Sequence, residues 1–165
     1  LFYSYTKRFT PLCHLVLGVG LGLAPVGAYI AITEQFSLAI VLLGFAVVCW
    51  VSGFDIIYSL QDEKFDKANG LYSIPSMLGG KNALFVSKIL HIGCVILILC
   101  FGILSKASYL YAAAAVLFTG FLIYQHTLVK PEDLSKVNRA FFTANGIGSV
   151  VFGTLVIADI CFLKQ

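Results

Sequence analysis

Residues 37–70 read SLAIVLLGFAVVCWVSGFDIIYSLQDEKFDKANG. The first part of this stretch is a continuous apolar run, and a helix needs about 20 such residues to cross a bilayer. The polar end places Asp62 and Asp66 four residues apart, with Asp55 seven residues before Asp62. On a helix both spacings bring side chains to one face. The stretch therefore predicts a membrane-spanning helix that ends in a stripe of three carboxylates.

The whole chain shares this apolar character. Hydrophobic residues make up 59% of its 165 residues and charged residues only 12%, whereas a soluble domain carries about a quarter charged residues. Five apolar stretches reach spanning length, and they are continuous rather than alternating, which favours helices over barrel strands. They are residues 11–32, 37–58, 82–104, 109–128 and 140–162. We expect an all-α, integral membrane helical bundle.

Basic residues are divided unevenly between the two sides of the expected bundle. Eight of them precede the first span or follow the second and fourth: Lys7, Arg8, Lys64, Lys67, Lys81, Lys130, Lys136 and Arg139. Only Lys106 and Lys164 lie on the other side, while Lys88 is inside the third span near its start, where its side chain can reach the interface. The positive-inside rule then places the aspartate-rich loop on the cytoplasmic side. The net charge of +3 requires no nucleic acid as a partner.

Glycine and proline positions predict local features. Gly18 and Gly22 form a small-xxx-small pair that lets another helix approach closely, and Pro25 is expected to kink the first span. Residues 69–70, Asn-Gly, are a turn signal that closes the helix after the aspartates. Residues 73–80 then form either a short interfacial helix that covers the site or an ordinary connector.

Two residue types that often bind metals have simpler interpretations here. The five cysteines fall within apolar spans without a C-x-x-C spacing, so we interpret them as small hydrophobic residues that pack between helices. His14, His91 and His126 lie at or near span ends and share no spacing. We interpret them as interfacial side chains with hydrogen-bond partners, rather than as metal ligands or bases. Asp159 lies near the opposite side and is given no role.

The carboxylate stripe points to a bound cation. Carboxylates in register repel each other unless a counter-ion is shared, and Mg²⁺ typically takes one or two carboxylates plus substrate phosphates. The stripe therefore suggests an enzyme that holds a diphosphate through Mg²⁺. Two alternatives stay open: Asp62 and Asp66 form salt bridges with Lys64 and Lys67 in a solvated loop, and Asp55 bonds to a neighbouring helix.

Four segments carry a family likeness, and they are spread over nearly the whole chain. They are Tyr3-x-x-x-Lys7, the Asp55…Asp62-x-x-x-Asp66 stripe, Gly70-Leu-Tyr-Ser-Ile-Pro, and Asn138-Arg-Ala-Phe-Phe-Thr-Ala-Asn145. In these segments the chain resembles the C-terminal part of the UbiA-type membrane prenyltransferases, which attach polyprenyl chains to aromatic acceptors.

The resemblance implies nine transmembrane helices and two aspartate-rich motifs in the complete enzyme. This chain would supply the last five helices and the second motif, as the C-terminal portion (residues 1–165) of a single transmembrane prenyltransferase domain. The first motif, Asn-Asp-x-x-x-Asp, is absent here, and the chain opens on Leu1 rather than Met. We therefore expect a fragment that lacks N-terminal helices of the same protein and is inactive alone.

The resemblance also implies a chemistry. Asp62 and Asp66 would bind Mg²⁺, which bridges to the diphosphate of a polyprenyl donor and stabilises the leaving group. The ring carbon ortho to the acceptor's hydroxyl would attack the allylic cation, in a site that excludes water. The acceptor would be 4-hydroxybenzoate for ubiquinone, or a dihydroxynaphthoate for menaquinone, in the bacterial plasma membrane. Neither the acceptor nor the prenyl chain length follows from the sequence.

Further residues enter the candidate site through this resemblance. Lys7 is a candidate diphosphate contact, with Tyr3 one turn before it. Arg8 would bind the diphosphate or the acceptor's carboxylate, since its fork suits planar oxyanions. Lys7 and Arg8 could equally be membrane anchors. Tyr58 and Asn145 could line the substrate cavity, although an interfacial tyrosine and an interhelical hydrogen bond explain them almost as well. The predicted catalytic set is Asp55, Asp62, Asp66 and Lys7.

Two other functions compete with the transferase. An ion-coupled carrier would use Asp55 as an intramembrane cation ligand, and it predicts carboxylates near the middle of the membrane. A non-catalytic remnant would keep one motif and have lost the other.

Overall fold

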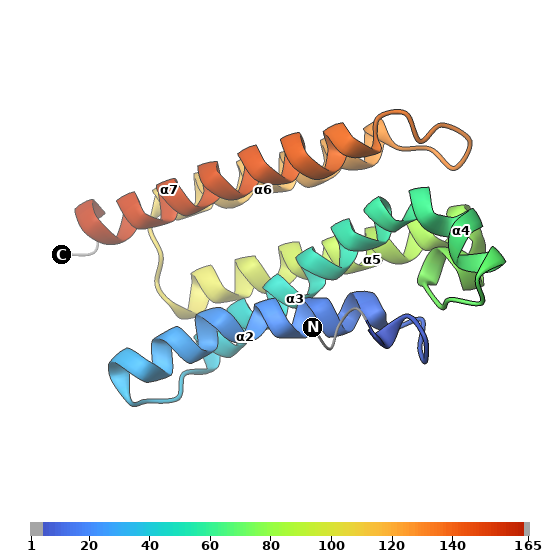
Figure 1. The fold of residues 1–165 in the computed structure, drawn as a ribbon. Coiled ribbons are helices and arrows are strands. Elements are labelled where there is room, and N and C mark those ends of the chain that lie inside the picture. Colours follow the sequence, from blue (N-terminus) through green and yellow to red (C-terminus); the bar gives the residue numbers. More distant parts are fainter. Residues whose placement is uncertain (1–4, 164–165) are drawn as a thin grey trace.

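The computed structural model describes residues 5–163. Five helices are long and apolar enough to cross a membrane, which confirms the expected all-α membrane bundle (Figure 1). They are α2 (Cys13–Thr33), α3 (Leu38–Ser59), α5 (Ile74–Leu104), α6 (Tyr109–Leu128) and α7 (Asn145–Leu163). Three short helical elements accompany them: η1 (Leu60–Asp62), α4 (Glu63–Ala68) and η2 (Arg139–Ala144).

Helix α3 lies at the centre of the bundle. It packs between α2 and α5, while α6 and α7 run side by side as a second layer (Figure 1). In its apolar part 44% of the residues are buried, against only 11% for α2 and α7. A core of Ile56, Ile57 and Leu60 packs against Ile74 and Ala83 of α5. The residues around η1 are therefore held on a well-packed base.

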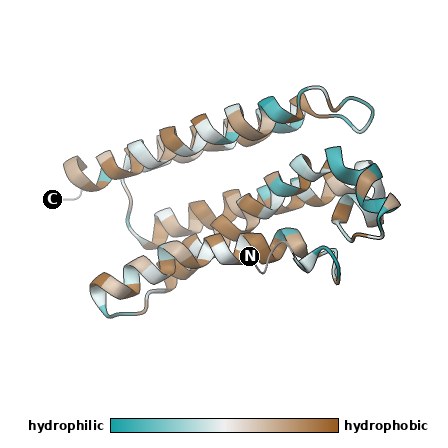
Figure 2. Cartoon of the chain, in the orientation of Figure 1, coloured by the Kyte–Doolittle hydropathy of each residue, from teal (hydrophilic) through white to brown (hydrophobic). Residues whose placement is uncertain are grey.

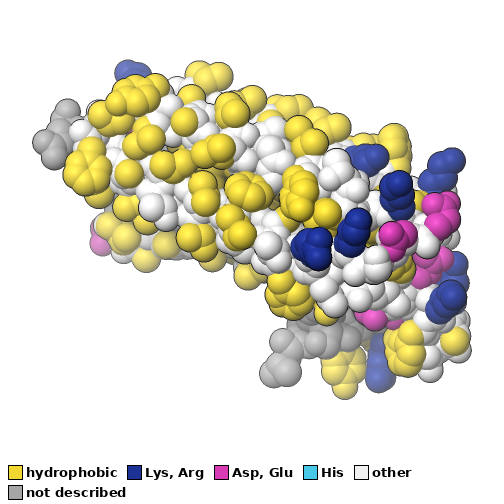
Figure 3. Space-filling model, turned by 90° about the horizontal axis from the view of Figure 1, so that it is seen from above, with side chains coloured by type: hydrophobic (Ala, Val, Ile, Leu, Met, Phe, Trp, Pro, Cys, Tyr) yellow, Lys and Arg dark blue, Asp and Glu magenta, His cyan; other side chains and the backbone are white. Residues whose placement is uncertain are grey.

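Charged side chains gather at one end of this apolar bundle. Figure 2 shows the polar residues around α4 and in the loop between α6 and η2, and Figure 3 shows acidic and basic side chains concentrated at the same end. Three segments lie at this end: residues 5–12, which precede α2, and residues 60–73 and 129–138. These are the loops that the sequence placed together on one side of the membrane.

The packing of α2 on α3 depends on glycine. A Cβ atom at Gly18 would clash with the side chain of Ser52 and the backbone of Val48, and one at Gly22 would clash with Val48 and the backbone of Gly44. The predicted close approach at the small-xxx-small pair is therefore confirmed. Helix α2 continues through Pro25 as a single element.

The segment between α4 and α5 follows the expected turn signals. Helix α4 ends at Ala68, and Gly70 adopts a positive φ of 64°, a conformation that costs glycine little. The Ser73 side chain then caps α5 in a reciprocal pair with Ser76. At Gly79 the backbone leaves helical geometry, with φ 76° and ψ 159°. Residues 74–78 thus form a short helical turn before the long span, as one of the two sequence alternatives predicted.

Asp159, to which the sequence assigned no role, ties α7 to α6 at the other end of the bundle. Its side chain is buried, and its carboxylate accepts hydrogen bonds from the Ser108 hydroxyl and from the backbone N–H groups of Ser108 and Tyr111 (N···O 3.4 and 3.1 Å). The free N–H groups at the start of a helix need such acceptors. Asp159 therefore caps α6 from a neighbouring helix.

We expect Asp159→Ala to lower the free energy of unfolding by about 2 kcal/mol, because it leaves buried donors without an acceptor. Thermal unfolding of the detergent-solubilised protein, followed by circular dichroism, measures the loss. Asp133→Ala is the matched control: Asp133 is exposed, and its side chain accepts hydrogen bonds from Ser135 in the same loop. Equal melting temperatures for the two variants would contradict the capping role.

Candidate functional site

Three of the predicted site residues meet at the charged end of the bundle. The ammonium group of Lys7 lies 3.1 Å from Oδ2 of Asp66 and 3.6 Å from Oδ2 of Asp62. The Asp66 side chain is 1% exposed, whereas that of Asp62 is 52% exposed. One carboxylate is therefore fixed inside the protein and the other faces outward, with a single positive charge between them.

This cluster differs from the salt-bridge alternative that the sequence left open. Among the ion pairs of residues 5–163, Lys67 pairs with Glu63 at 2.6 Å. The cation that contacts both Asp62 and Asp66 is Lys7, from a segment far away in the sequence. The aspartates are thus held by a tertiary contact rather than by their neighbours in the loop.

Asp55 does not join the other two carboxylates. Its carboxylate is hydrogen-bonded to His14, and residues 5–163 contain no group of three or more acidic, histidine or cysteine side chains placed to hold a metal ion. Asp55 is therefore separate from Asp62 and Asp66, and the alternative in which it bonds to a neighbouring helix is confirmed.

The electrostatics of Lys7 follow from its position. Burial by itself lowers the pKa of the ammonium group, but the hydrogen bond to Asp66 and the charges of Asp66 and Asp62 outweigh it. The pKa of Lys7 is therefore raised above its ordinary value of 10.5. Lys7 stays protonated at neutral pH and reduces the repulsion between the two carboxylates.

His14 connects three helices next to this cluster. Its ring is fully buried, and Nδ1 lies 2.7 Å from Oδ2 of Asp55. The backbone N–H of Ile74 donates to Nε2 at 3.4 Å, and the Ser52 hydroxyl donates to the His14 carbonyl oxygen at 3.1 Å. Because Nε2 accepts, the hydrogen bonds assign the proton to Nδ1, which donates to Asp55.

The sequence interpretation missed this role of His14. A signal was available: the start of the first span and the end of the second lie on the same side of a two-helix hairpin. Two buried titratable residues at those positions, His14 and Asp55, are therefore brought together by topology. The same region is tied to the next loop, since the Tyr72 N–H donates to the Lys7 carbonyl oxygen at 2.6 Å.

A row of aromatic rings runs from α3 to η2. Trp50, Phe54 and Tyr58 follow one another at helical spacing, and ring centroids lie 5.3 Å apart for Phe54 and Phe141 and 4.3 Å apart for Tyr58 and Phe141. Asn145 lies at the far end of this row, where its Oδ1 accepts from the Trp50 indole N–H at 3.4 Å. The predicted residues Tyr58 and Asn145 thus share one aromatic surface.

This surface includes an irregular helix and an unsatisfied amide. The Nδ2 atom of Asn145 is buried and has no hydrogen-bond partner among the described residues. The preceding element, η2, is a π-helix, a geometry that is frequent at functional sites. A buried donor without a partner costs stability, so Asn145 is a position where a ligand acceptor would be favourable.

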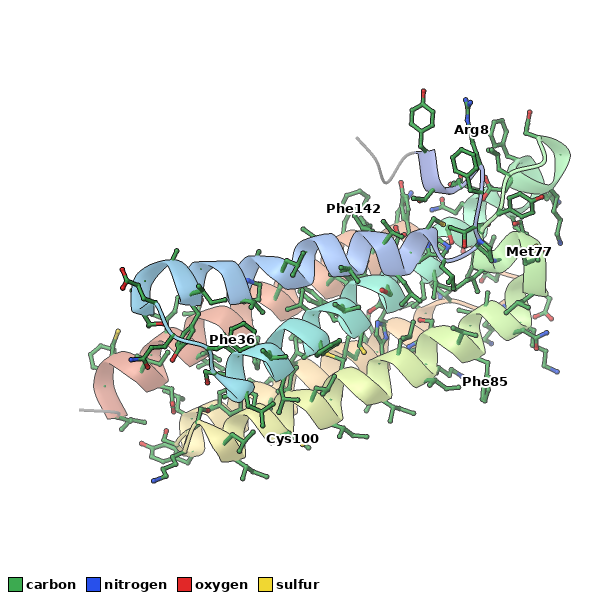
Figure 4. The ribbon with its side chains drawn as sticks, turned by 90° about the horizontal axis from the view of Figure 1, so that it is seen from below. Arg8, Phe36, Met77, Phe85, Cys100 and Phe142 are labelled. Carbon is green, nitrogen blue, oxygen red and sulfur yellow. The ribbon has the colours of Figure 1, made fainter. Side chains whose placement is uncertain are left out.

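Arg8 stands apart from these groups. The Arg8 guanidinium lies over the ring of Tyr5, with its carbon 5.2 Å from the ring centroid. Figure 4 shows the Arg8 side chain pointing away from the helices. Arg8 is therefore not part of the Lys7 cluster, and Tyr3 lies outside the described residues.

Curated proteins of known name are similar to this chain. The chain is 28% identical to the 4-hydroxybenzoate octaprenyltransferase of Tolumonas auensis over 94% of this chain and 54% of that protein. It is 28% identical to the enzyme of the same name from Cronobacter sakazakii, over 97% of this chain and 55% of that protein. The chain thus spans about half the length of the curated relatives it matches.

A solved structure is also similar to this chain. The apo structure of a UbiA homolog from Aeropyrum pernix K1 superposes with a TM-score of 0.84 at 33% identity, over 97% of this chain and 60% of that chain. The family model described as the UbiA prenyltransferase family matches residues 1–147. This multi-pass membrane protein therefore belongs to the UbiA prenyltransferase family.

Proposed function

We propose that this chain is the C-terminal portion of a membrane prenyltransferase domain that transfers a polyprenyl group from its diphosphate to an aromatic acid such as 4-hydroxybenzoate. The observation that carries the proposal is the convergence of Lys7, Asp62 and Asp66 at the charged end of an apolar bundle. A polyprenyl diphosphate has an anionic end and a long apolar end, so the two parts of the molecule match the two parts of the protein. The names of the curated relatives support the acceptor.

Asp62 and Asp66 suit a Mg²⁺ ion. Both offer oxygen donors, and Mg²⁺ is usually bound by one or two carboxylates together with substrate phosphates. Their oxygens already converge on one positive charge, the Lys7 ammonium group, so their positions are compatible with a cation. When bound, the ion would supply Lewis acidity that stabilises negative charge on the departing diphosphate.

Lys7 would assist the same step from the protein side. Its ammonium group, protonated because its pKa is raised, would donate hydrogen bonds to diphosphate oxygens beside Asp62 and Asp66. The allylic C–O bond breaks and its electron pair leaves with the diphosphate. A ring carbon ortho to the acceptor's hydroxyl then bonds to the allylic carbon, and loss of the ring proton restores aromaticity.

The aromatic row of α3 and η2 would protect the allylic cation. Phe54 packs edge to face against Trp50 and Phe141, and Tyr58 is tilted against Phe141, so the rings form an apolar wall. Such a wall excludes water, which would trap the cation, and ring faces attract positive charge. Asn145, with a free Nδ2 donor, would bind an oxygen of the acceptor.

The proposal also covers the remainder of the enzyme. We infer that further N-terminal helices supply the other aspartate-rich motif, so that this chain alone is inactive. The half-length match to the curated relatives supports this inference. The excess of basic residues at the charged end supports a cytoplasmic position for the active-site loop. The bacterial relatives, named 4-hydroxybenzoate octaprenyltransferases, support a plasma-membrane location and a role in ubiquinone synthesis; menaquinone synthesis is the alternative that a naphthoate acceptor would indicate.

The carrier hypothesis lacks the geometry that it requires. It predicts carboxylates near the middle of the membrane, whereas Asp55 pairs with His14, the second residue of α2. Asp55 is therefore held near the charged end of the bundle and already has a partner.

Removing the metal tests the proposed function directly. Membranes that contain the full-length protein are incubated with a polyprenyl diphosphate and 4-hydroxybenzoate, and the prenylated acid is quantified by mass spectrometry. We expect EDTA to abolish product and added Mg²⁺ to restore it, because the two carboxylates and the diphosphate are all negatively charged and need a cation between them. A parallel assay with a dihydroxynaphthoate decides the acceptor.

Each outcome of this assay bears on a separate part of the proposal. Product formation that continues unchanged in EDTA would remove the metal from the mechanism. Absence of prenylated product with either acceptor, in membranes where the protein is folded, would overturn the transferase proposal itself.

A further inference from the structure

Two adjoining hollows lie between α5 and α6, away from the Lys7 cluster. Lys88 and His126 line both of them, so the hollows form one continuous groove. The first has a volume of about 490 Å³ and the second about 480 Å³. Neither is lined by any residue of the Lys7 cluster or of the aromatic row. We call the whole feature the α5–α6 groove.

The groove has one apolar part and one basic part. The apolar part is lined by Ile92, Val95, Ile96, Leu122 and Ile123, among others. The basic part lies at the charged end, where Lys81, Lys88 and Lys130 line it together with one acidic residue, Glu132. All three lysines are exposed. The groove therefore carries a net positive charge in its basic part and has an apolar lining in the other part.

The groove opens on the outer surface of the bundle. Ile92, Ile96 and Ile123 are 60%, 55% and 62% exposed, although they line it. Figure 4 shows Phe85, which lines the basic part, pointing away from the helices. Within residues 5–163 no helix covers these side chains, and we take this surface to face lipid. A molecule could therefore enter the groove sideways from the bilayer.

The length of the apolar part matches one leaflet. From Lys88 to Ile96 the helix rises by about 12 Å, and half of the hydrocarbon core of a bilayer is about 15 Å. One acyl chain of a phospholipid spans a similar depth. The lysines then lie at the level of the headgroups, where a phosphate is found.

A histidine pair, with His91 buried and His126 half-buried, forms the boundary between the two parts. His91 Nε2 lies 3.3 Å from the Trp50 carbonyl oxygen and therefore donates to it, which leaves His91 Nδ1 to accept from His126 Nε2 at 2.8 Å. The remaining nitrogen of His126, Nδ1, is then an acceptor, and it has no partner among the described residues. The boundary thus carries an unsatisfied acceptor next to Lys88, suited to a hydroxyl group.

We propose that the α5–α6 groove binds one anionic phospholipid, with its phosphate at Lys81, Lys88 and Lys130 and an acyl chain along Ile92 and Ile123. A headgroup that combines a phosphodiester with hydroxyl groups, as in phosphatidylglycerol, fits the charge of the lysines and the free acceptor of His126. The site is separate from the proposed catalytic cluster, so it goes beyond the proposed function.

Native mass spectrometry of the purified full-length protein, titrated with phosphatidylglycerol, tests the site. The variant Lys81→Gln/Lys88→Gln/Lys130→Gln is expected to bind at least about 10-fold more weakly, since a basic residue near an anionic lipid surface contributes about 1 kcal/mol. The control Lys64→Gln/Lys67→Gln/Lys136→Gln removes the same charge from the same end but none of the groove lining. It is expected to bind within twofold of the wild type.

A second variant tests binding of the lipid's acyl chain separately from the effect of the lysine charges. Ile92→Phe/Ile123→Phe fills the apolar part and keeps every lysine, and we expect it to weaken long-chain phosphatidylglycerol about 10-fold. Phosphatidylcholine serves as the neutral lipid, for which we expect no difference between variants.

Three results would overturn the proposal. The first is equal loss of affinity in the two lysine variants, which would indicate a diffuse charge effect. The second is full competition by inorganic phosphate, which would indicate an ion site without a lipid. The third is exclusive binding of a polyprenyl diphosphate, which would make the groove a substrate site. Prenyl transfer is measured in parallel, so failure here is distinct from failure of the proposed function.

Discussion

Replacing Asp66 with Asn in the full-length protein is expected to lower kcat/KM for prenyl transfer by at least about 100-fold. Asp66 is the buried carboxylate of the cluster, held 3.1 Å from the Lys7 ammonium group. The substitution keeps the shape of the side chain and removes its charge, so a cation at this position loses one of two anionic ligands. A 100-fold loss corresponds to about 2.7 kcal/mol of transition-state stabilisation, within the range expected for a metal that stabilises a leaving group.

Glu63→Gln is the matched control for this variant. Glu63 lies in the same short helix, α4, but it pairs with Lys67 rather than with Lys7. We expect Glu63→Gln to retain activity within twofold. Asp62→Asn should require a higher Mg²⁺ concentration for half-maximal rate, a shift that a purely structural role would not produce. Similar rates for Asp66→Asn and Glu63→Gln would show that the cluster is not the reaction centre.

The spans were predictable because hydrophobicity and length are strong local signals. Helices α3 and α6 begin and end within one residue of the expected stretches. Within α5 the backbone leaves helical geometry at Gly79, so the long span begins after that residue, close to the expected start at residue 82. The residues before the break, capped by Ser73 and Ser76, form a separate helical turn.

The candidate site was harder to predict from the sequence than the spans were. The spacing of Asp62 and Asp66 suggested a shared cation, but only the family resemblance singled out Lys7, because nothing local links residues this far apart. The contact between Asp55 and His14 depends on how two helices cross, which spacing within one helix cannot reveal.

The crossing of α2 and α3 gives the second large prediction. We expect Gly18→Val to lower the free energy of unfolding by about 3 kcal/mol. A Cβ atom at Gly18 would clash with the Ser52 side chain and with the backbone of Val48. Backbone cannot rotate away as a side chain can, so we place the cost at the upper end of the 1–3 kcal/mol usual for overpacking. Thermal unfolding of the purified protein measures the change.

Gly20→Val is the control that isolates this contact. It adds the same side chain to the same helix, with the same change in helix propensity, but a Cβ atom at Gly20 meets nothing within 4 Å. We expect its melting temperature to stay near that of the wild type. Gly18→Val should also reduce prenyl transfer, because Ser52 donates to the His14 carbonyl oxygen and a displaced α2 moves His14 away from Asp55. Equal stability of the two valine variants would mean that α2 can shift relative to α3 without cost. The Asp55–His14 contact would then not depend on the close approach of the two helices at Gly18.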